Sequence, residues 1–166
     1  MTLNTLPQGD LELLDTDLAR RMLVSTELAR LAYVAADGTP RVMPMLFHWT
    51  GAEVVMSTFA GTAKLAALRA RPAVAITIDR AGPPPEVLLV RGNAVVTEMD
   101  GAVPEYVAAH RRYYGPEQGE AAIAEVERLG LRMARIAVRP EWVGTFDFQE
   151  RFPGGVSAEE FAGRGR

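Results

Sequence analysis

Apolar side chains near the N-terminus recur at the spacing of a helix. Leucine or methionine stands at every third or fourth position, namely at Leu11, Leu14, Leu18 and Met22. Because an α-helix has about 3.6 residues per turn, this spacing places the four side chains on one face. We therefore expect an amphipathic helix over residues 10–25 that packs on the core through this face.

Strand patterns dominate the following part of the chain. Segments rich in apolar and β-branched side chains alternate with turn residues, and the pair Asp37-Gly38 is typical of a hairpin turn. In residues 73–79 the larger apolar side chains stand at every second position, as in a half-buried strand. We expect strands, in chain order, over residues 29–35, 40–49, 53–59, 73–79, 86–98, 132–139 and 141–148.

Helical patterns interrupt the strands twice. Residues 63–70 consist mainly of good helix formers and end before a proline. Residues 102–129 carry two apolar stripes separated by Gly115-Pro116, which predicts two short helices. Several short strands joined by tight turns, with these helices beside them, indicate a small antiparallel β-barrel decorated by short helices.

The composition is that of one globular domain, which we place at residues 1–150, followed by a tail at 151–166 that is rich in glycine and charge. The 166 residues are 48% hydrophobic and 23% charged, which excludes wholesale disorder. A net charge of −3 without a long basic run argues against nucleic acid or an anionic membrane and favours a small-molecule partner.

Three further absences in the sequence narrow the class of protein. No apolar run is long enough to span a membrane, and residues 1–10 lack a secretion leader, so we expect a cytoplasmic protein. The chain has no cysteine and only two histidines, His48 and His110, which disfavours a metal centre. No side-chain set for nucleophilic or acid-base catalysis stands out, so a cofactor would carry any chemistry.

The turn before the 63–70 helix has the features of a phosphate-binding loop. Gly61 suits a tight turn, and Thr62 is a good helix N-cap. The first N–H groups of a helix carry partial positive charge, so a lysine in the first turn is unfavourable unless an anion lies nearby. Lys64 stands there. The motif predicts an anion site, with a solvated surface lysine as the alternative.

The 40–49 segment predicts a covered strand. It places apolar side chains at both odd and even positions, whereas a strand of an antiparallel barrel commonly faces water on one side. A second subunit or a ligand would supply the extra covering, and we expect a homodimer. Pro44 cannot donate to a sheet ladder, which leaves a gap where a planar ligand could reach the backbone; a bulged core strand is the alternative.

Together these motifs resemble the FMN-binding split barrels of the pyridoxamine-phosphate oxidase-like superfamily. The resemblance spans most of the chain and rests on residues 39–44, Ser57-Thr58, residues 61–64 with Leu68 and Pro72, and a late strand that begins at Arg139-Pro140. It implies a mainly β fold with short helices, a six-stranded antiparallel Greek-key split barrel. It also implies a dimer that binds FMN in the groove between subunits and transfers hydride or electrons to or from a small organic substrate.

The resemblance implies roles for particular residues as well. Lys64 would pair with the FMN phosphate, Thr62 and the Ala63 amide would hydrogen-bond to it, and Arg41 would approach it from the neighbouring strand. Many FMN-binding relatives carry a second basic residue where this chain has Ala63. The remaining residues would line the isoalloxazine ring with their backbone or support the ribityl chain: Val42, Met43, Pro44 and Met45 for the ring, Ser57 and Thr58 for the chain.

Two other interpretations stay open. The same fold could bind a deazaflavin coenzyme, whose longer acidic tail would need extra basic contacts such as Arg69 or Arg71. The protein could also be a non-catalytic flavin- or haem-binding module, with His48 or His110 as the iron ligand. Without such a role, we expect His48 to be a core residue and residues 110–112 to form a solvated helix face.

Overall fold

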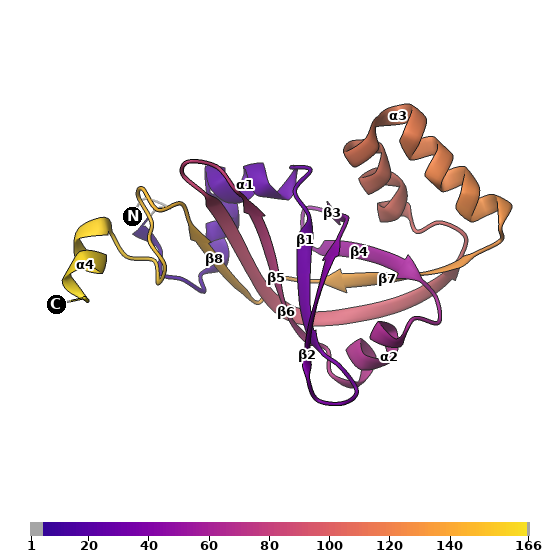
Figure 1. Cartoon of the computed structure of the whole chain (residues 1–166), viewed down its shortest axis with the longest axis horizontal. Coiled ribbons are helices and arrows are strands. Elements are labelled where there is room, and N and C mark those ends of the chain that lie inside the picture. Colours follow the sequence, from indigo (N-terminus) through magenta and orange to yellow (C-terminus); the bar gives the residue numbers. More distant parts are fainter. Residues whose placement is uncertain (1–4, 166) are drawn as a thin grey trace.

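The structure is a computed structural model that describes residues 5–165 (Figure 1). Residues 1–4 and 166, at the outer ends of the predicted domain and tail, lie outside the described residues. The strands are β1 (Ala29–Val34), β2 (Pro40–Met45), β3 (Phe47–Trp49), β4 (Val54–Phe59), β5 (Ala73–Arg80), β6 (Glu86–Asp100), β7 (Arg132–Val138) and β8 (Trp142–Phe146). The helical segments are the 3₁₀-helix η2 (Leu11–Asp15), α1 (Asp17–Leu23), α2 (Ala63–Ala70), α3 (Pro104–Arg128) and α4 (Ala158–Gly163).

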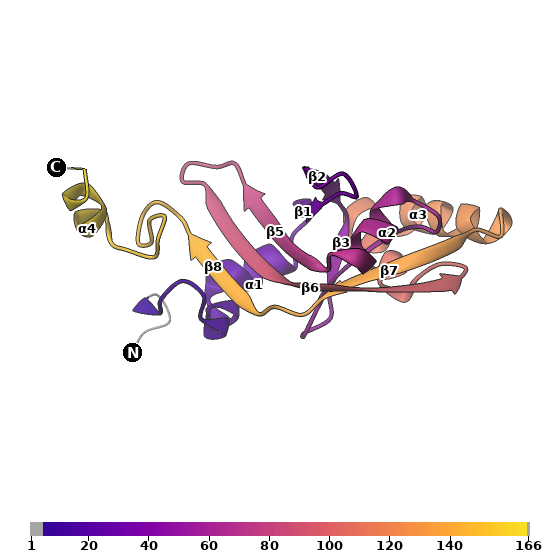
Figure 2. The same ribbon diagram turned by 90° about the horizontal axis from the view of Figure 1, so that it is seen from below.

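The strands form one curled antiparallel sheet. Neighbouring strands follow the order β2-β1-β5-β6-β7-β4-β3, and β8 pairs with β6. The first half of the long strand β6 pairs with β5 and β8 and its second half with β7, so β6 belongs to both halves of the sheet (Figure 2). The predicted mainly β split barrel with short helices is confirmed. The described residues form 8 strands, rather than the six that the resemblance implied.

The predicted strand 40–49 is in fact two strands on opposite edges of the sheet. β2 pairs with β1, where Met45 lies opposite Ala29, whereas β3 pairs with β4, where Phe47 lies opposite Met56. The chain therefore crosses from one edge to the other at Leu46. The apolar side chains at odd and even positions belong to two differently placed strands, and in the single chain most of β2 is exposed on both faces.

The predicted N-terminal helix is also interrupted. Thr16 has extended backbone and separates η2 from α1, because its side chain accepts a hydrogen bond from the Ala19 amide and so begins a new helix. Leu18 and Met22 are buried as predicted, but Leu11 is exposed. Because the chain changes direction at this break, Leu13 lies in the core and Leu11 does not.

The predicted break inside the 102–129 segment is confirmed. α3 kinks at Gly115, whose φ of 78° lies in the left-handed region, and Pro116 follows. The C-terminal tail is more regular than predicted, since α4 begins with a capping box between Ser157 and Glu160. α4 lies at the opposite end of the molecule from α3 (Figure 1).

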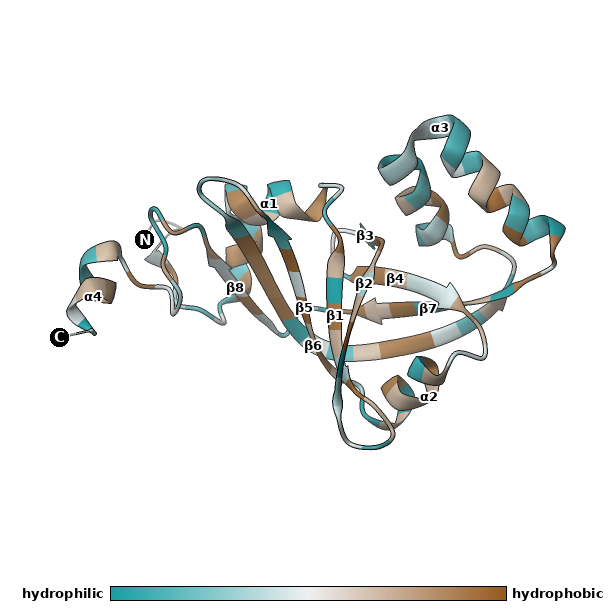
Figure 3. Ribbon diagram, in the orientation of Figure 1, coloured by the Kyte–Doolittle hydropathy of each residue, from teal (hydrophilic) through white to brown (hydrophobic). Residues whose placement is uncertain are grey.

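The core lies inside the curl of the sheet. Its fully buried side chains come mainly from the strands and include Leu31, Phe47, Ile76, Leu88 and Ile136. Figure 3 shows hydrophobic colouring along the central strands and alternating hydrophobic and hydrophilic residues along α3. Within residues 5–165, no helix combines the length and the apolar character needed to cross a membrane.

Candidate functional site

The start of α2 is built as predicted but is not capped by its own chain. Gly61 has a φ of 81°, and Thr62 takes the extended N-cap conformation before the helix begins at Ala63. The Thr62 side chain accepts no hydrogen bond from the first turn, and its Oγ1 is buried without a partner among the described residues. The first N–H groups of an α-helix lack intrahelical acceptors, so this end of α2 can donate to an external acceptor.

Lys64 adds an unneutralised charge to the same end. Its side chain is half-buried, and burial lowers the pKa of its ammonium group below the usual value. No ion pair or hydrogen bond of this ammonium group is found among residues 5–165, and the first turn of α2 contains no acidic residue. Lys64 is also the single lysine of the sequence. The start of α2 therefore concentrates positive charge that the described chain leaves uncompensated.

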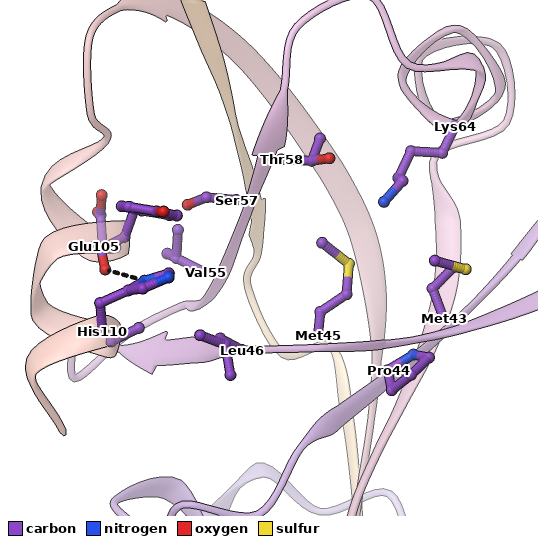
Figure 4. A pocket seen from close by; sticks show the side chains of 12 residues that line it. Met43, Pro44, Met45, Leu46, Val55, Ser57, Thr58, Lys64, Glu105 and His110 are labelled. Carbon is purple, nitrogen blue, oxygen red and sulfur yellow. Dashed lines mark hydrogen bonds between the residues drawn. The ribbon is translucent and has the colours of Figure 1, made fainter. Parts of the chain in front are cut away.

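A pocket of about 190 Å³ opens beside this end of α2 (Figure 4). It lies between α2, α3, β4 and the segment that runs from β2 to β3. Six of the residues predicted to bind a cofactor line it: Met43, Pro44, Met45, Ser57, Thr58 and Lys64. The fold thus brings together most of the predicted ring-binding residues, both predicted ribityl-binding residues and one predicted phosphate-binding residue, Lys64.

A second cavity of about 300 Å³ shares Lys64 with the first. Arg41 and Ala63 line it together with Asp37 and Tyr33. Two of the predicted residues, Val42 and Thr62, line neither cavity, and the Val42 side chain is 60% exposed.

Arg41 differs from Lys64 in that its own chain supplies an anion. Its guanidinium donates to the Asp37 carboxylate at 3.0 Å and to the Thr39 hydroxyl. The hydrogen bonds from Thr39, and then Arg41, lower the pKa of Asp37 to about 2. The Asp37 carboxylate is therefore ionised at neutral pH and offsets the charge of Arg41.

The wall that α3 contributes to the first pocket was not predicted. It consists of Glu105, Tyr106, Ala109 and His110. Arg135 donates to Glu105 at 2.9 Å through Nε and lies 2.8 Å from the same carboxylate through Nη2. Burial alone would raise the pKa of Glu105, but the hydrogen bonds from Arg135 and the backbone outweigh it, so that the pKa is lowered and the group is ionised.

His110 is buried, and the prediction of a solvated face over residues 110–112 is wrong for two of the three. The His110 ring packs on Tyr106, with ring centroids 3.7 Å apart. Arg112 donates to the carbonyls of Ser25 and Phe47, which fixes α3 to the segment after α1 and to β3. The spacing of four residues between Tyr106, His110 and Tyr114 is the sequence signal that marks this helix face.

His48 lies outside both cavities and is half-buried beside α3. Its Nδ1 is 3.5 Å from Nη1 of Arg112, and burial, together with that guanidinium, lowers the pKa of the imidazole. Within residues 5–165 no group of three or more metal-ligating side chains converges.

Comparison with known proteins assigns this chain to a family. The family model for pyridoxamine 5'-phosphate oxidase matches residues 16–146, and the chain therefore belongs to that family. None of the curated proteins matches the chain.

Solved structures show the same fold. A conserved hypothetical protein from Mycobacterium tuberculosis is 19% identical, with 88% of this chain and 89% of that chain covered and a TM-score of 0.64. An F420 reductase is 27% identical over 74% of this chain and 93% of that chain, with a TM-score of 0.56. A FAD-binding protein from Mesorhizobium loti is 20% identical over 75% of this chain and 88% of that chain, with a TM-score of 0.50.

Proposed function

We propose that this chain is an oxidoreductase that binds a flavin-type coenzyme through the start of α2. The observation that carries the proposal is an uncapped helix end whose uncompensated Lys64 lines a mostly apolar pocket, together with the buried Thr62 hydroxyl that has no partner among the described residues. A coenzyme phosphate would supply the missing acceptor and the missing negative charge. Family membership supports the same coenzyme class.

The residues present fit FMN at stated positions. Lys64, the Ala63 amide and the Thr62 hydroxyl would hold the phosphate, and Arg41 would approach it from β2. The backbone of residues 42–45 would line the ring, and Ser57 and Thr58 would contact the ribityl chain. When bound, FMN supplies hydride or electron transfer to a small organic substrate, and the apolar lining at Met43, Met45 and Val55 would exclude water.

A deazaflavin is the second candidate, and the F420 reductase that matches at 27% identity favours it. The second cavity offers room beyond Lys64 for a longer tail. Of the two arginines proposed to hold such a tail, Arg71 donates to the carbonyl of Ala35, which lines that cavity. Arg69 is instead paired with Glu98 on β6 at 2.6 Å. Arg71 is therefore the better candidate contact.

Parallel titrations with FMN and with F420, followed by mass spectrometry of whatever co-purifies, test the proposal. We expect quenching of coenzyme fluorescence on saturation with one of the two, and reduction of a substrate panel by the reduced coenzyme. A protein that binds neither coenzyme contradicts the proposal. A protein that binds a flavin without turnover supports the non-catalytic module instead, and a haem spectrum supports the haem-binding one.

A second copy of the chain would complete the site. β2 is an edge strand with Val42 and Met43 exposed on it, next to the residues proposed to line the coenzyme ring. Burial of these side chains against a second copy would favour a homodimer. Light scattering of the purified protein should give twice the mass of the chain, and Val42→Glu should shift it toward one chain. A monomeric wild-type protein contradicts this part of the proposal.

A further inference from the structure

The first pocket has two chemically different ends. Lys64 lies at one end, and Glu105 and His110 on α3 lie at the other, with Thr58 and Met45 between them (Figure 4). The proposed phosphate site uses only the Lys64 end. The groups on α3 therefore face the part of the pocket that remains for a reactant.

The orientation of His110 exposes one ring nitrogen to the pocket. Its Nδ1 lies 2.9 Å from the carbonyl oxygen of Tyr106, and a carbonyl can only accept, so Nδ1 carries the hydrogen. In the neutral ring the lone pair then belongs to Nε2. No described residue hydrogen-bonds to Nε2, and the ring points into the pocket (Figure 4). The side chain thus presents a hydrogen-bond acceptor there.

The surrounding structure holds this orientation. The Tyr106 ring packs on the imidazole, and the Tyr114 ring lies 5.5 Å away between centroids. The second half of α3 folds back behind His110, where a Cβ at Gly119 would lie 3.0 Å from the His110 carbonyl oxygen. Only a glycine allows the two halves to approach so closely. His110 is therefore a fixed group, 8% exposed.

Burial favours the neutral imidazole of His110, because it lowers the pKa of the ring. The titratable groups that face the same pocket are Lys64 on α2 and Glu105 and Tyr106 on α3; the lining residues from β2 to β4 are apolar or carry hydroxyl groups. Glu105 is paired with Arg135, and burial raises the pKa of Tyr106, so that its phenol stays protonated.

We propose that His110 is the proton acceptor of this pocket, through Nε2, for a reactant that presents an O–H or N–H group to it. This inference rests on the proposed function. When such a reactant is oxidised, the proton of its O–H or N–H group would move to Nε2 of His110, and the reverse step would return it. The bound flavin-type coenzyme would supply the hydride transfer that accompanies this proton transfer.

A pair of probes that differ in one donor group tests the acceptor. Phenol and toluene have the same shape, and only phenol can donate to Nε2. With FMN-loaded protein at pH 7.5, we expect phenol to bind roughly 3-fold to 10-fold more tightly than toluene, as one added hydrogen bond implies. This preference should disappear below the pKa of His110, because the protonated ring cannot accept. It should also be lost in His110→Phe, which keeps the ring stacked on Tyr106.

Controls separate this inference from the proposed function. His110→Gln keeps an acceptor and should retain part of the preference, and His48→Gln changes the histidine outside the pocket and should retain all of it. Equal preference in wild type and His110→Phe, with FMN bound by both, overturns the role of His110 and leaves the proposed function intact. Failure of wild type to bind either coenzyme overturns the proposed function.

If His110→Phe does not fold, NMR of the wild-type protein without coenzyme or probe still tests the inference. The ¹⁵N chemical shifts of the His110 ring in the wild-type protein should show hydrogen on Nδ1 and a pKa below that of free histidine. Hydrogen on Nε2 at pH 7.5 overturns the inference.

Discussion

The helices α1 and α4 begin in one way and α2 in another, while α3 lacks a side-chain cap but carries Glu105 in its first turn. α1 begins at Thr16, whose hydroxyl accepts from the Ala19 amide at 3.2 Å, and α4 begins with a capping box at Ser157. Both carry carboxylates in the first turn. α2 begins at Thr62 with no side-chain cap, no carboxylate and a lysine.

This difference separates the two helix ends that are capped by their own side chains from the end that we propose binds a phosphate. A side-chain cap and an acidic first turn satisfy the free N–H groups and the helix dipole within the chain. At α2 the same residue type, threonine, stands at the N-cap but makes no such bond. α1 and α4 obtain a hydrogen-bond acceptor and negative charge from their own side chains, and α2 would obtain both from a bound phosphate.

The largest expected effect is on coenzyme binding in Lys64→Met. Loss of a charge-assisted hydrogen bond should weaken FMN binding about 10-fold to 100-fold, measured by fluorescence titration. The unliganded protein should not lose stability, because burial lowers the pKa of Lys64 and so makes the ammonium group unfavourable in the folded state. Arg69→Met, on the same helix but paired with Glu98, is the matched control and should bind FMN as wild type does. Equal loss in both variants would refute a specific role for Lys64.

The two threonine N-caps should respond oppositely to replacement by valine. Thr16 is buried, accepts from Ala19 and donates to the Leu13 carbonyl at 2.7 Å, so Thr16→Val should cost about 1–2 kcal/mol in urea unfolding of the unliganded protein. Thr62→Val removes a buried hydroxyl without a partner among the described residues, so unliganded stability should stay equal or rise. FMN affinity should fall several-fold in Thr62→Val alone. A similar loss of stability in both variants would show that Thr62 is an ordinary cap.

Mild acid should destabilise the fold through His48 and His110, the two histidines at α3, before the carboxylates titrate. Burial lowers the pKa values of both His48 and His110 below 6.5 in the folded chain. The unfolded chain then binds more protons below that pH, so the stabilising contribution is complete above pH 6.5 and declines as the pH falls below it. Urea unfolding at pH 7.5 and 5.5 should show this loss, and the double variant His48→Gln with His110→Gln should reduce it. A loss confined to lower pH would instead indicate carboxylates with lowered pKa values, such as Glu105 and Asp147.

The smallest effect should follow Ser157→Ala at the start of α4. This removes the capping box, but α4 buries no side chain, so the free energy of global unfolding should change by less than about 0.5 kcal/mol. Amide hydrogen exchange of Glu160 should accelerate several-fold. Destabilisation of the whole chain would mean that α4 supports the barrel and is not merely a locally capped helix.

Local sequence patterns predicted most helices and strands, and particular residues show which features of the fold such patterns do not predict. The sequence correctly predicted the turn at Gly61, the N-cap position of Thr62 and the helix break at Gly115, because the backbone preferences of these residues act within a few positions. The division of the 40–49 segment at Leu46 was missed, because a change of pairing partner leaves no local signal when both strands are apolar.

The α3 wall shows the same limit for the site. Glu105 and His110 come to line one pocket with residues of β4 and α2 only through tertiary packing, and the sequence analysis placed His110 on a surface that the fold buries. The residues around Lys64 were predictable because they adjoin one another along the chain.

The most direct test is the pKa of Lys64 with and without a phosphate. Because Lys64 is the single lysine of the sequence, protein labelled with ¹⁵N at the lysine side chain gives one ammonium signal to follow with pH. Riboflavin lacks only the phosphate of FMN. We expect the pKa of Lys64 to lie below its usual value in the unliganded protein, to rise when FMN binds and to stay low when riboflavin binds. The same pKa with both ligands would contradict the assignment of the α2 start as the phosphate site.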